Sequence, residues 1–362
     1  MNVHDNIFRK ALNLETLSAN ELMQIYQFAD TGELMFTASQ LRQIHVPGNG
    51  VSWQIDRNVN ITNVCISGCK FCNFHCKPSQ KGKSYTTTLD EYIEKIEELI
   101  ILNGDQLLLQ GGLHPNYGLD FYMNLFSQLK QLYPNIKLHA LGPPEIAHIA
   151  QKEKKSYREI LEKLVEAGLD SLPGAGAEIL CDRVRKQISP AKPNSQMWLD
   201  VMREAHKLNL PTSATMVCGH IETLEERIEH LVKIRNLQAE KPQNAYGFLA
   251  FICWFMQLKG TKLGAEIGEQ TATVDEYIRT VAISRIALNN ITNIQASWLT
   301  AGKNIAQIAL HAGANDMGSI MIEEHVVSSA GATNTLDAKG IQNAICEAGF
   351  TPWLRNQKYE AR

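Results

Sequence analysis

Three cysteines fall within one short stretch of the sequence, with the spacing Cys65-x3-Cys69-x2-Cys72. Three thiolates on one loop can bind three corners of a 4Fe-4S cluster and leave the fourth iron open to another ligand. A structural zinc or iron-sulfur site would need four protein ligands, and Cys76 follows as a candidate fourth. The loop therefore predicts a metal centre around which the rest of the chain is organised.

The composition fits a folded protein that acts on a small molecule. Of 362 residues, 44% are hydrophobic and 20% are charged, enough apolar surface for one large core or two smaller ones. The net charge of -3 gives no electrostatic reason to expect nucleic acid or an anionic membrane as partner. No apolar run reaches the roughly 18 residues of a membrane span, and the first residues lack a signal-peptide pattern. Eight cysteines without a disulfide framework suit a reducing compartment, so we expect a cytoplasmic protein.

The chain divides into a helical extension and a longer α/β domain. Residues 1–48 have helical periodicity, with Ser18 and Glu21 as a capping box, and we expect them to pack on the main domain at 49–362. From Val51 onward strand and helix patterns alternate, which is typical of parallel strands with helical crossovers. Eight strands are expected, at 52–64, 106–112, 136–141, 169–173, 212–217, 246–254, 293–298 and 312–318. They predict a (β/α)8 TIM-type barrel completed by the C-terminal strands, or an open six-unit barrel if the last two are absent.

Residues that follow the strands are the candidates for ligand contact, because a parallel barrel places its active site at the C-terminal strand ends. Gln110, Gly111 and Gly112 follow the second strand, and two glycines allow close approach of backbone to a ligand. His139 lies on the third strand and Glu145 follows it, and Glu178 follows the fourth strand. Structural alternatives remain. The two glycines could form an ordinary tight turn, His139 could be a hydrogen-bonded core histidine, and Glu178 could be a carboxylate stabilised by a helix N-terminus.

Candidate proton acceptors follow the fifth and eighth strands. They are His220 and Glu222 in the first of these loops and Asp316 and Glu323 in the second. Each could equally be a solvated rim group. His220 is the first choice as a catalytic base, because a pKa near about 6.5 leaves its imidazole neutral at cytosolic pH.

The cysteine loop, with Phe71 before its last thiol, resembles that of the radical S-adenosylmethionine superfamily. In that superfamily the open iron chelates the methionyl group of S-adenosylmethionine, and one electron from the cluster yields a 5'-deoxyadenosyl radical. The resemblance implies a 4Fe-4S cluster on the three cysteines and a reductant such as flavodoxin or ferredoxin. It also implies contact of S-adenosylmethionine with Phe71, Phe74, Gln110, Gly111, Gly112, His139 and Glu178. A zinc knuckle and a passive electron carrier remain the alternatives.

Longer segments resemble the futalosine-pathway branch of this superfamily, namely 55–72, 174–185, 214–223, 313–319 and 323–324. The resemblance implies a ring closure in menaquinone biosynthesis, with dehypoxanthine futalosine as substrate. The radical would remove the ribose C4' hydrogen, the carbon radical would add to the benzoate ring, and loss of an electron and a proton would restore aromaticity. An aminofutalosine-synthase type of radical addition is the alternative. The chain departs from the branch at His75-Cys76, where Tyr-Arg is expected, and at 251–258, where a proline-rich segment is expected.

Overall fold

The computed structural model describes residues 3–77, 79–80, 82–270 and 272–362, so residues 1 and 2 of the expected extension lie outside it. Its strands form two parallel sheets, one in the order β5-β6-β7-β8-β1-β9 and one in the order β2-β3-β4. The strands are β1 (Gly50–Gln54), β2 (Asp56–Asn60), β3 (Gln106–Gln110), β4 (Lys137–Ala140), β5 (Thr212–Cys218), β6 (Phe248–Phe255), β7 (Asn293–Gln295), β8 (Asp316–Ser319) and β9 (Thr351–Leu354).

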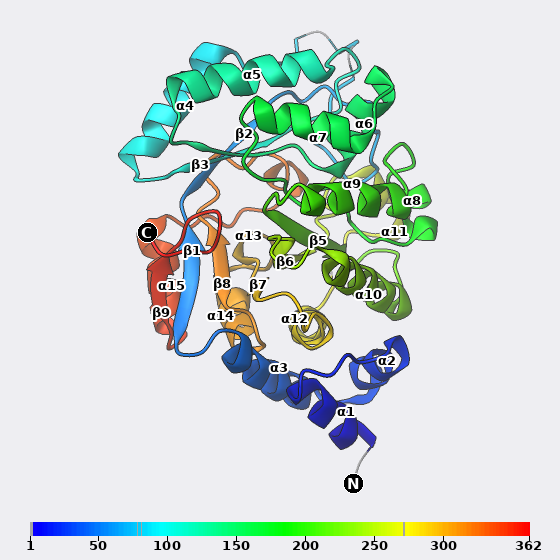
Figure 1. The fold of residues 1–362 in the computed structure, drawn as a ribbon. Coiled ribbons are helices and arrows are strands. Elements are labelled where there is room, and N and C mark those ends of the chain that lie inside the picture. The colour runs from blue at the N-terminus through cyan, green and yellow to red at the C-terminus, as the bar shows by residue number, and fades with distance from the viewer. Residues whose placement is uncertain (1–2, 78, 81, 271) are drawn as a thin grey trace.

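Helices surround these strands (Figure 1). They are α1 (Val3–Leu12), α2 (Ala19–Phe28), α3 (Thr31–His45), α4 (Leu89–Ile101), α5 (Leu119–Leu132), α6 (Pro143–Glu153), α7 (Tyr157–Glu166), α8 (Asp182–Ile188), α9 (Ser195–Lys207), α10 (Leu224–Glu240), α11 (Lys262–Ile267), α12 (Val274–Ala287), α13 (Trp298–Ala301), α14 (Lys303–His311) and α15 (Ala338–Glu347). Capping boxes at Ser18, Thr88, Ser156 and Thr223 fix the starts of α2, α4, α7 and α10.

The two sheets are joined on both sides. At one side β1 and β2 are consecutive, and a parallel bridge links Arg57 to Ile322 just beyond β8. At the other side Ser171 bridges His139 of β4, and Leu172 bridges Thr212 of β5. The expected fourth strand is thus reduced to isolated bridges, followed by Pro173, which has no N–H for a longer ladder. All eight expected strand positions are occupied, in the parallel order of a TIM-type barrel.

The N-terminal helices α1 to α3 lie beside α10, α12 and α14 at one side of the barrel (Figure 1). Buried hydrogen bonds hold them there: the Tyr26 hydroxyl lies 2.7 Å from the Thr280 hydroxyl, and Arg279 donates to the Ala29 carbonyl at 2.9 Å. The apolar side of α2, with Leu22 and Ile25, is fully buried. These helices therefore pack on the barrel helices through both apolar and polar contacts.

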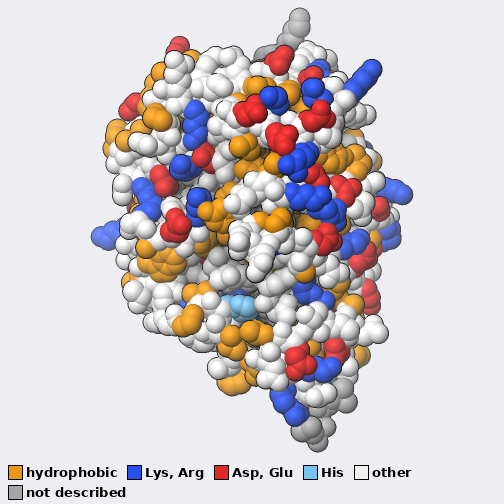
Figure 2. Space-filling model, in the orientation of Figure 1, with side chains coloured by type: hydrophobic (Ala, Val, Ile, Leu, Met, Phe, Trp, Pro, Cys, Tyr) orange, Lys and Arg blue, Asp and Glu red, His pale blue; other side chains and the backbone are white. Residues whose placement is uncertain are grey.

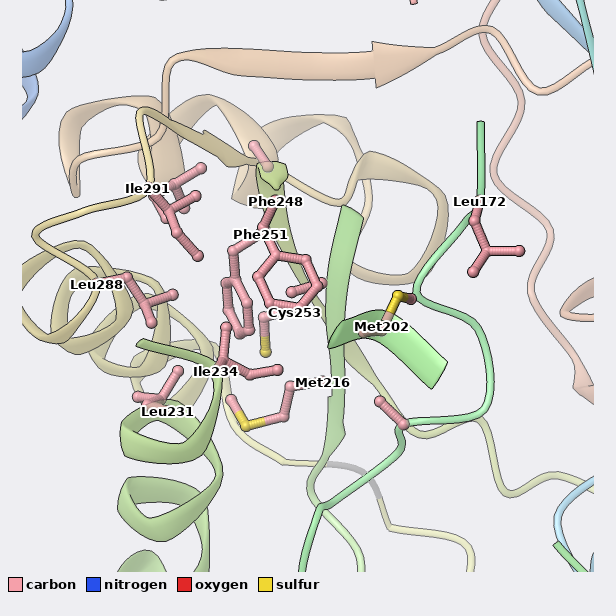
Figure 3. Packing of buried hydrophobic residues seen from close by; sticks show 14 of the residues in the cluster. Leu172, Met202, Met216, Leu231, Ile234, Phe248, Phe251, Cys253, Leu288 and Ile291 are labelled. Atoms are coloured by element: carbon pink, nitrogen blue, oxygen red, sulfur yellow. The ribbon is translucent and has the colours of Figure 1, made fainter. Parts of the chain in front are cut away.

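The apolar core lies between the strands and the outer helices. Figure 3 shows Met216, Phe251 and Cys253 packed toward Leu231 and Ile234. These strand residues alternate with residues that face the barrel interior, as the period of two requires. The helical layer therefore takes the apolar face of each strand and leaves the other face to the lumen.

The C-terminal segment adds elements that the strand pattern does not predict. Helix α15 leads into β9, which pairs in parallel with β1 on the edge of the larger sheet. Beyond β9 the chain turns under the barrel, where Arg355 is 5% exposed and Gln357 donates to the Ser171 hydroxyl. The last residues therefore line the lower end of the lumen.

The surface has no single-sign character on the face seen in Figure 2, where acidic and basic side chains are interspersed. Among the described residues, no helix is both long enough and apolar enough to cross a membrane.

Candidate active site

A cavity of 390 Å³ runs through the lumen to the cysteine loop. Inward-facing residues of β1 to β8 line it, and along the first expected strand, which is divided into β1 and β2, these are the polar residues Gln54, Asp56 and Asn58. Gln106 and Gln110 continue this polar lining on β3. A barrel lumen that only stabilised the fold would be filled by branched apolar side chains. This lumen is instead built to hold a polar ligand.

The three thiols Cys65, Cys69 and Cys72 all line the upper end of this cavity. The Cys65 sulfur accepts the backbone N–H groups of Ser67 at 3.4 Å and Leu113 at 3.3 Å. Such donors stabilise a thiolate and orient it.

The electrostatic surroundings of the other two thiols differ. Burial raises the pKa of Cys69 to about 12, although the Lys192 ammonium opposes this shift. Burial also acts on Cys72, but hydrogen bonds from His75 outweigh it and leave the pKa of Cys72 below its usual value. A bound metal would deprotonate both thiols, because metal ligation selects the thiolate.

Cys76 points away from the cavity. It is buried, and its sulfur lies 3.4 Å from both the Lys77 carbonyl and Gln80 Oε1. Its backbone pairs with the cysteine loop, since Cys65 N–H donates to the Cys76 carbonyl at 3.0 Å. Cys76 thus supports the loop from outside the cavity that the other three thiols line.

The donor set fits a cluster better than a single ion. Among the described residues, no three His, Cys, Asp or Glu side chains converge closely enough to hold one metal ion. A zinc ion with Zn–S bonds of about 2.3 Å would draw its thiolates together, whereas cluster thiolates bind different irons and stand farther apart. Three free thiols facing one cavity, with no fourth, match a 4Fe-4S cluster that has one open iron.

Gly111 and Gly112 line the cavity, and both also pack against the cysteine loop. A Cβ on Gly111 would lie 2.9 Å from the Thr62 carbonyl oxygen, and one on Gly112 would lie 2.2 Å from the Val64 carbonyl oxygen. The glycines therefore let the β3 loop approach the backbone that carries Cys65, and this contact explains them without a ligand.

We expect Gly112→Ala to displace the cysteine loop, because the clash is with backbone and cannot be relieved by a rotamer change. The free energy of unfolding should fall by about 1–3 kcal/mol, and the iron bound after anaerobic reconstitution should fall several-fold. The control is Gly32→Ala, since Gly32 lies in α3 and a methyl group added there would meet no other atom within 4 Å. Wild-type iron content in Gly112→Ala would contradict this account of the glycine.

Glu178 reaches the cavity and is 5% exposed. Lys192 donates to its Oε1 at 2.6 Å, and Arg185 lies 3.6 Å from its Oε2, which accepts no hydrogen bond. The Lys192 ammonium also lies 5.5 Å from the centre of the Phe71 ring, which brings it close to the cysteine loop. The site thus contains an ammonium group, of Lys192, that can donate further hydrogen bonds, and a carboxylate oxygen, Glu178 Oε2, that accepts none.

The other expected cofactor contacts also line the cavity, namely Phe71, Phe74, Gln110 and His139. His139 shares a hydrogen bond with the Ser171 hydroxyl. Burial lowers the pKa of His139 to about 3, so its imidazole is neutral and can only donate or accept a hydrogen bond.

The expected bases of the fifth loop do not reach the cavity. The side chains of His220 and Glu222 are fully buried and lie 3.2 Å from each other. Arg227 donates to Glu222 at 2.7 Å, and the Gly219 N–H donates to the same carboxylate at 2.6 Å. Burial lowers the pKa of His220. The loop folds back toward α10 because Arg227 provides the charge that this carboxylate needs.

The candidate proton acceptors that follow the eighth strand, Asp316 and Glu323, likewise do not line the cavity. Asp316 is fully buried behind the lumen and accepts a hydrogen bond from Arg355 at 2.6 Å. Glu323 lies outside the cavity, where it pairs with Arg57 at 2.7 Å and with Lys95. Both carboxylates are neutralised by cations, so neither is placed to take a proton from a ligand in the lumen.

The cavity is also lined by Glu145, which the segment after the third strand offered without a role, and by three groups that the sequence patterns did not single out, namely Lys192, Arg355 and Gln357. The alternation of polar residues from Ser52 to Asn60 was a further signal, because it marks a strand with a polar inner face. Nothing comparable marks Lys192, Arg355 and Gln357, because they come from a loop and the C-terminal tail.

Two family models match the chain. The Radical SAM superfamily model covers residues 59–234, which hold the cysteine loop and Glu178. A model described as the CofH/MqnC C-terminal region covers residues 245–362, which hold β6 to β9 and the tail that lines the lumen.

Characterised relatives match over most of their length. The chain is 40% identical to a cyclic dehypoxanthine futalosine synthase of Streptomyces coelicolor, over 95% of this chain and 85% of that protein. It is 37% identical to a 5-amino-6-(D-ribitylamino)uracil--L-tyrosine 4-hydroxyphenyl transferase of Archaeoglobus fulgidus, over 89% of this chain and 91% of that protein. The fold matches methylornithine synthase with a TM-score of 0.72 at 16% identity, over 97% of this chain and 98% of that one. That likeness confirms the expected barrel fold.

Proposed function

Because the chain belongs to the radical S-adenosylmethionine superfamily and to its futalosine-pathway branch, we propose that it cyclises dehypoxanthine futalosine in menaquinone biosynthesis. The observation that carries the proposal is the continuous cavity with three thiols at one end and polar side chains among the apolar residues of the lumen below them. Relatives that bear the name of this activity match nearly the whole chain, including the segment that lines the lumen.

We assign the cluster to Cys65, Cys69 and Cys72, and the polar parts of S-adenosylmethionine to Lys192 and Glu178. The ammonium of Lys192 suits the methionyl carboxylate, and Glu178 Oε2, which accepts no hydrogen bond, suits a hydroxyl or ammonium donor. When bound, the cluster and S-adenosylmethionine supply a 5'-deoxyadenosyl radical. The electron would come from a carrier such as flavodoxin or ferredoxin, and the free thiols suit the cytoplasm.

The role of the protein is then to hold one C–H bond of the substrate against the radical source. A primary alkyl radical attacks most C–H bonds, so selectivity depends on contact and on exclusion of water. Gln54, Asn58 and Gln106 line the lumen and offer amide groups to the ribose hydroxyls.

Two other radical reactions fit the same scaffold. One is the addition carried out by aminofutalosine synthase. The other is the reaction of the 4-hydroxyphenyl transferases, whose name specifies 5-amino-6-(D-ribitylamino)uracil and L-tyrosine. Both need the same thiol loop, so only the substrate can separate them.

A substrate comparison tests the proposal. Reconstituted protein is incubated with S-adenosylmethionine, reductant and either dehypoxanthine futalosine, the aminofutalosine synthase substrate, or the ribitylaminouracil with L-tyrosine. We expect a cyclised product only from dehypoxanthine futalosine, identified by mass and NMR. Product from either of the other mixtures, with none from dehypoxanthine futalosine, would reassign the activity.

A further inference from the structure

Glu145 is a buried carboxyl group in the cavity, and among the described residues no cation lies within ion-pair distance of it. Glu145 is 9% exposed and lines the cavity, and its Oε2 has no hydrogen-bond partner. It occupies the first turn of α6, after Gly142 and two prolines. That short, rigid start fixes the position of the side chain at the edge of the lumen.

The other carboxylates that line the described cavity are committed to partners. Glu178 is bound by Lys192, and Asp56 accepts hydrogen bonds from Ser319 and Gln106. Glu324 accepts the backbone N–H groups of residues 326 to 328. A carboxylate that already satisfies a cation or several donors loses those interactions if it takes up a proton. Glu145 has less to lose, because its Oε2 accepts no hydrogen bond and no cation in the described part of the chain lies within ion-pair distance.

We propose that Glu145 is the catalytic base of the closing step, and this rests on the proposed cyclisation. After the carbon radical has added to the benzoate ring, the ring carries one sp³ C–H bond and one unpaired electron. The C–H bond breaks and its proton passes to a Glu145 oxygen. The two electrons of the C–H bond and the unpaired electron remain on the ring. Two of these three complete the aromatic system, and the third passes to a one-electron carrier of the ferredoxin or flavodoxin class.

The surroundings of Glu145 suit this role. Burial raises its pKa to about 7, and the nearby Glu178 adds to that shift. The backbone N–H groups of Gly142 and of Glu145 itself, with the Lys192 ammonium, oppose it. The Tyr122 phenol on α5 is the remaining titratable neighbour, and burial keeps it protonated. A base whose pKa lies near the working pH can both take up and release a proton.

The test compares Glu145→Gln with Glu153→Gln. Glu153 lies at the other end of α6, outside the cavity, where its Oε1 accepts the Leu119 N–H at 3.1 Å, a bond that glutamine can keep. Loss of a general base lowers a rate by about 10²–10⁴-fold. We therefore expect Glu145→Gln to form 5'-deoxyadenosine from S-adenosylmethionine at near the wild-type rate but cyclised product roughly a hundredfold more slowly. Glu153→Gln should match the wild type in both.

Product at the wild-type rate in Glu145→Gln would overturn the assignment. An equal fall in 5'-deoxyadenosine and product would also overturn it, since Glu145 would then act in binding. If the wild type itself does not cyclise dehypoxanthine futalosine, the proposed function fails instead.

An infrared titration tests the carboxyl independently of turnover. The difference between wild type and Glu145→Gln, recorded across pH on protein without substrate, should show a protonated carboxyl band that disappears as the pH rises through about 7. A carboxyl that stays protonated well above neutral pH would overturn the assignment, whatever the substrate, because it could not then accept a proton.

Discussion

Replacing any one of Cys65, Cys69 and Cys72 by alanine should abolish the 4Fe-4S cluster and all turnover. Each of the three thiols lines the same end of the cavity, and the described cavity offers no further cysteine to replace a lost one. With two thiolates a cubane retains two open irons and is not held. The measurement is iron and sulfide content with the Mössbauer or EPR spectrum after anaerobic reconstitution. 5'-Deoxyadenosine formation serves as the functional readout.

Cys76→Ala is the matched control for these variants. Its sulfur faces Gln80 and not the cavity, so the variant should keep a full cluster and turn over at the wild-type rate. The wild-type cluster should show one iron site distinct from the other three, because one iron lacks a cysteine. If Cys76→Ala lost the cluster while one of the other three alanine variants kept it, the ligand assignment would be wrong.

Arg355→Met should destabilise the protein by about 3–5 kcal/mol, because it leaves a buried charge unpaired. Arg355 donates to the fully buried Asp316 at 2.6 Å and to Gln54 at 2.6 Å, and it lies over the Tyr359 ring. Without it, Asp316 keeps only the Ser52 hydroxyl and the Gly318 N–H as hydrogen-bond partners. Denaturant unfolding of the purified protein measures the change.

Two further variants distinguish the loss of the buried Arg355–Asp316 ion pair from the effect of removing any charged side chain. Asp316→Asn combined with Arg355→Met should recover part of the stability, since the uncompensated charge is then removed. Lys303→Met breaks the exposed pair with Glu347 and should cost less than about 1 kcal/mol. A loss below about 1 kcal/mol in Arg355→Met would show that the tail does not anchor the barrel.

The barrel was predictable from periodicity, but the edge strand β9 beside β1 was not. The expected strands at 106–112 and 212–217 correspond to β3 and β5, because buried parallel strands have continuous apolar patterns and clear turns. Strand β9 was missed, since Thr351-Pro-Trp-Leu is short and contains a proline that argues against a strand. Its place beside β1 depends on contacts between opposite ends of the chain, which local patterns do not encode.

The metal loop was predictable because its function requires fixed spacing within a few residues. Side chains that reach the cavity from separate strands need no fixed spacing in the sequence. Sequence patterns therefore predicted these residues less well than the cysteine loop. His220 was chosen for its intrinsic pKa, but the fold places it in a buried network with Glu222 and Arg227. Glu145 was offered by the segment after the third strand, but nothing in the sequence marked it as the base. Its significance lies in a buried Oε2 that has no hydrogen-bond partner, which only the three-dimensional arrangement reveals.

Transfer of the substrate C4' hydrogen tests the central claim most directly, namely that this cavity holds the ribose of dehypoxanthine futalosine against the radical source. The wild-type protein is incubated with S-adenosylmethionine, reductant and substrate deuterated at C4', and the 5'-deoxyadenosine is examined by mass spectrometry. The account predicts one deuterium in the 5'-deoxyadenosine for each molecule of cyclised product. Unlabelled 5'-deoxyadenosine from protein with a full cluster would contradict it.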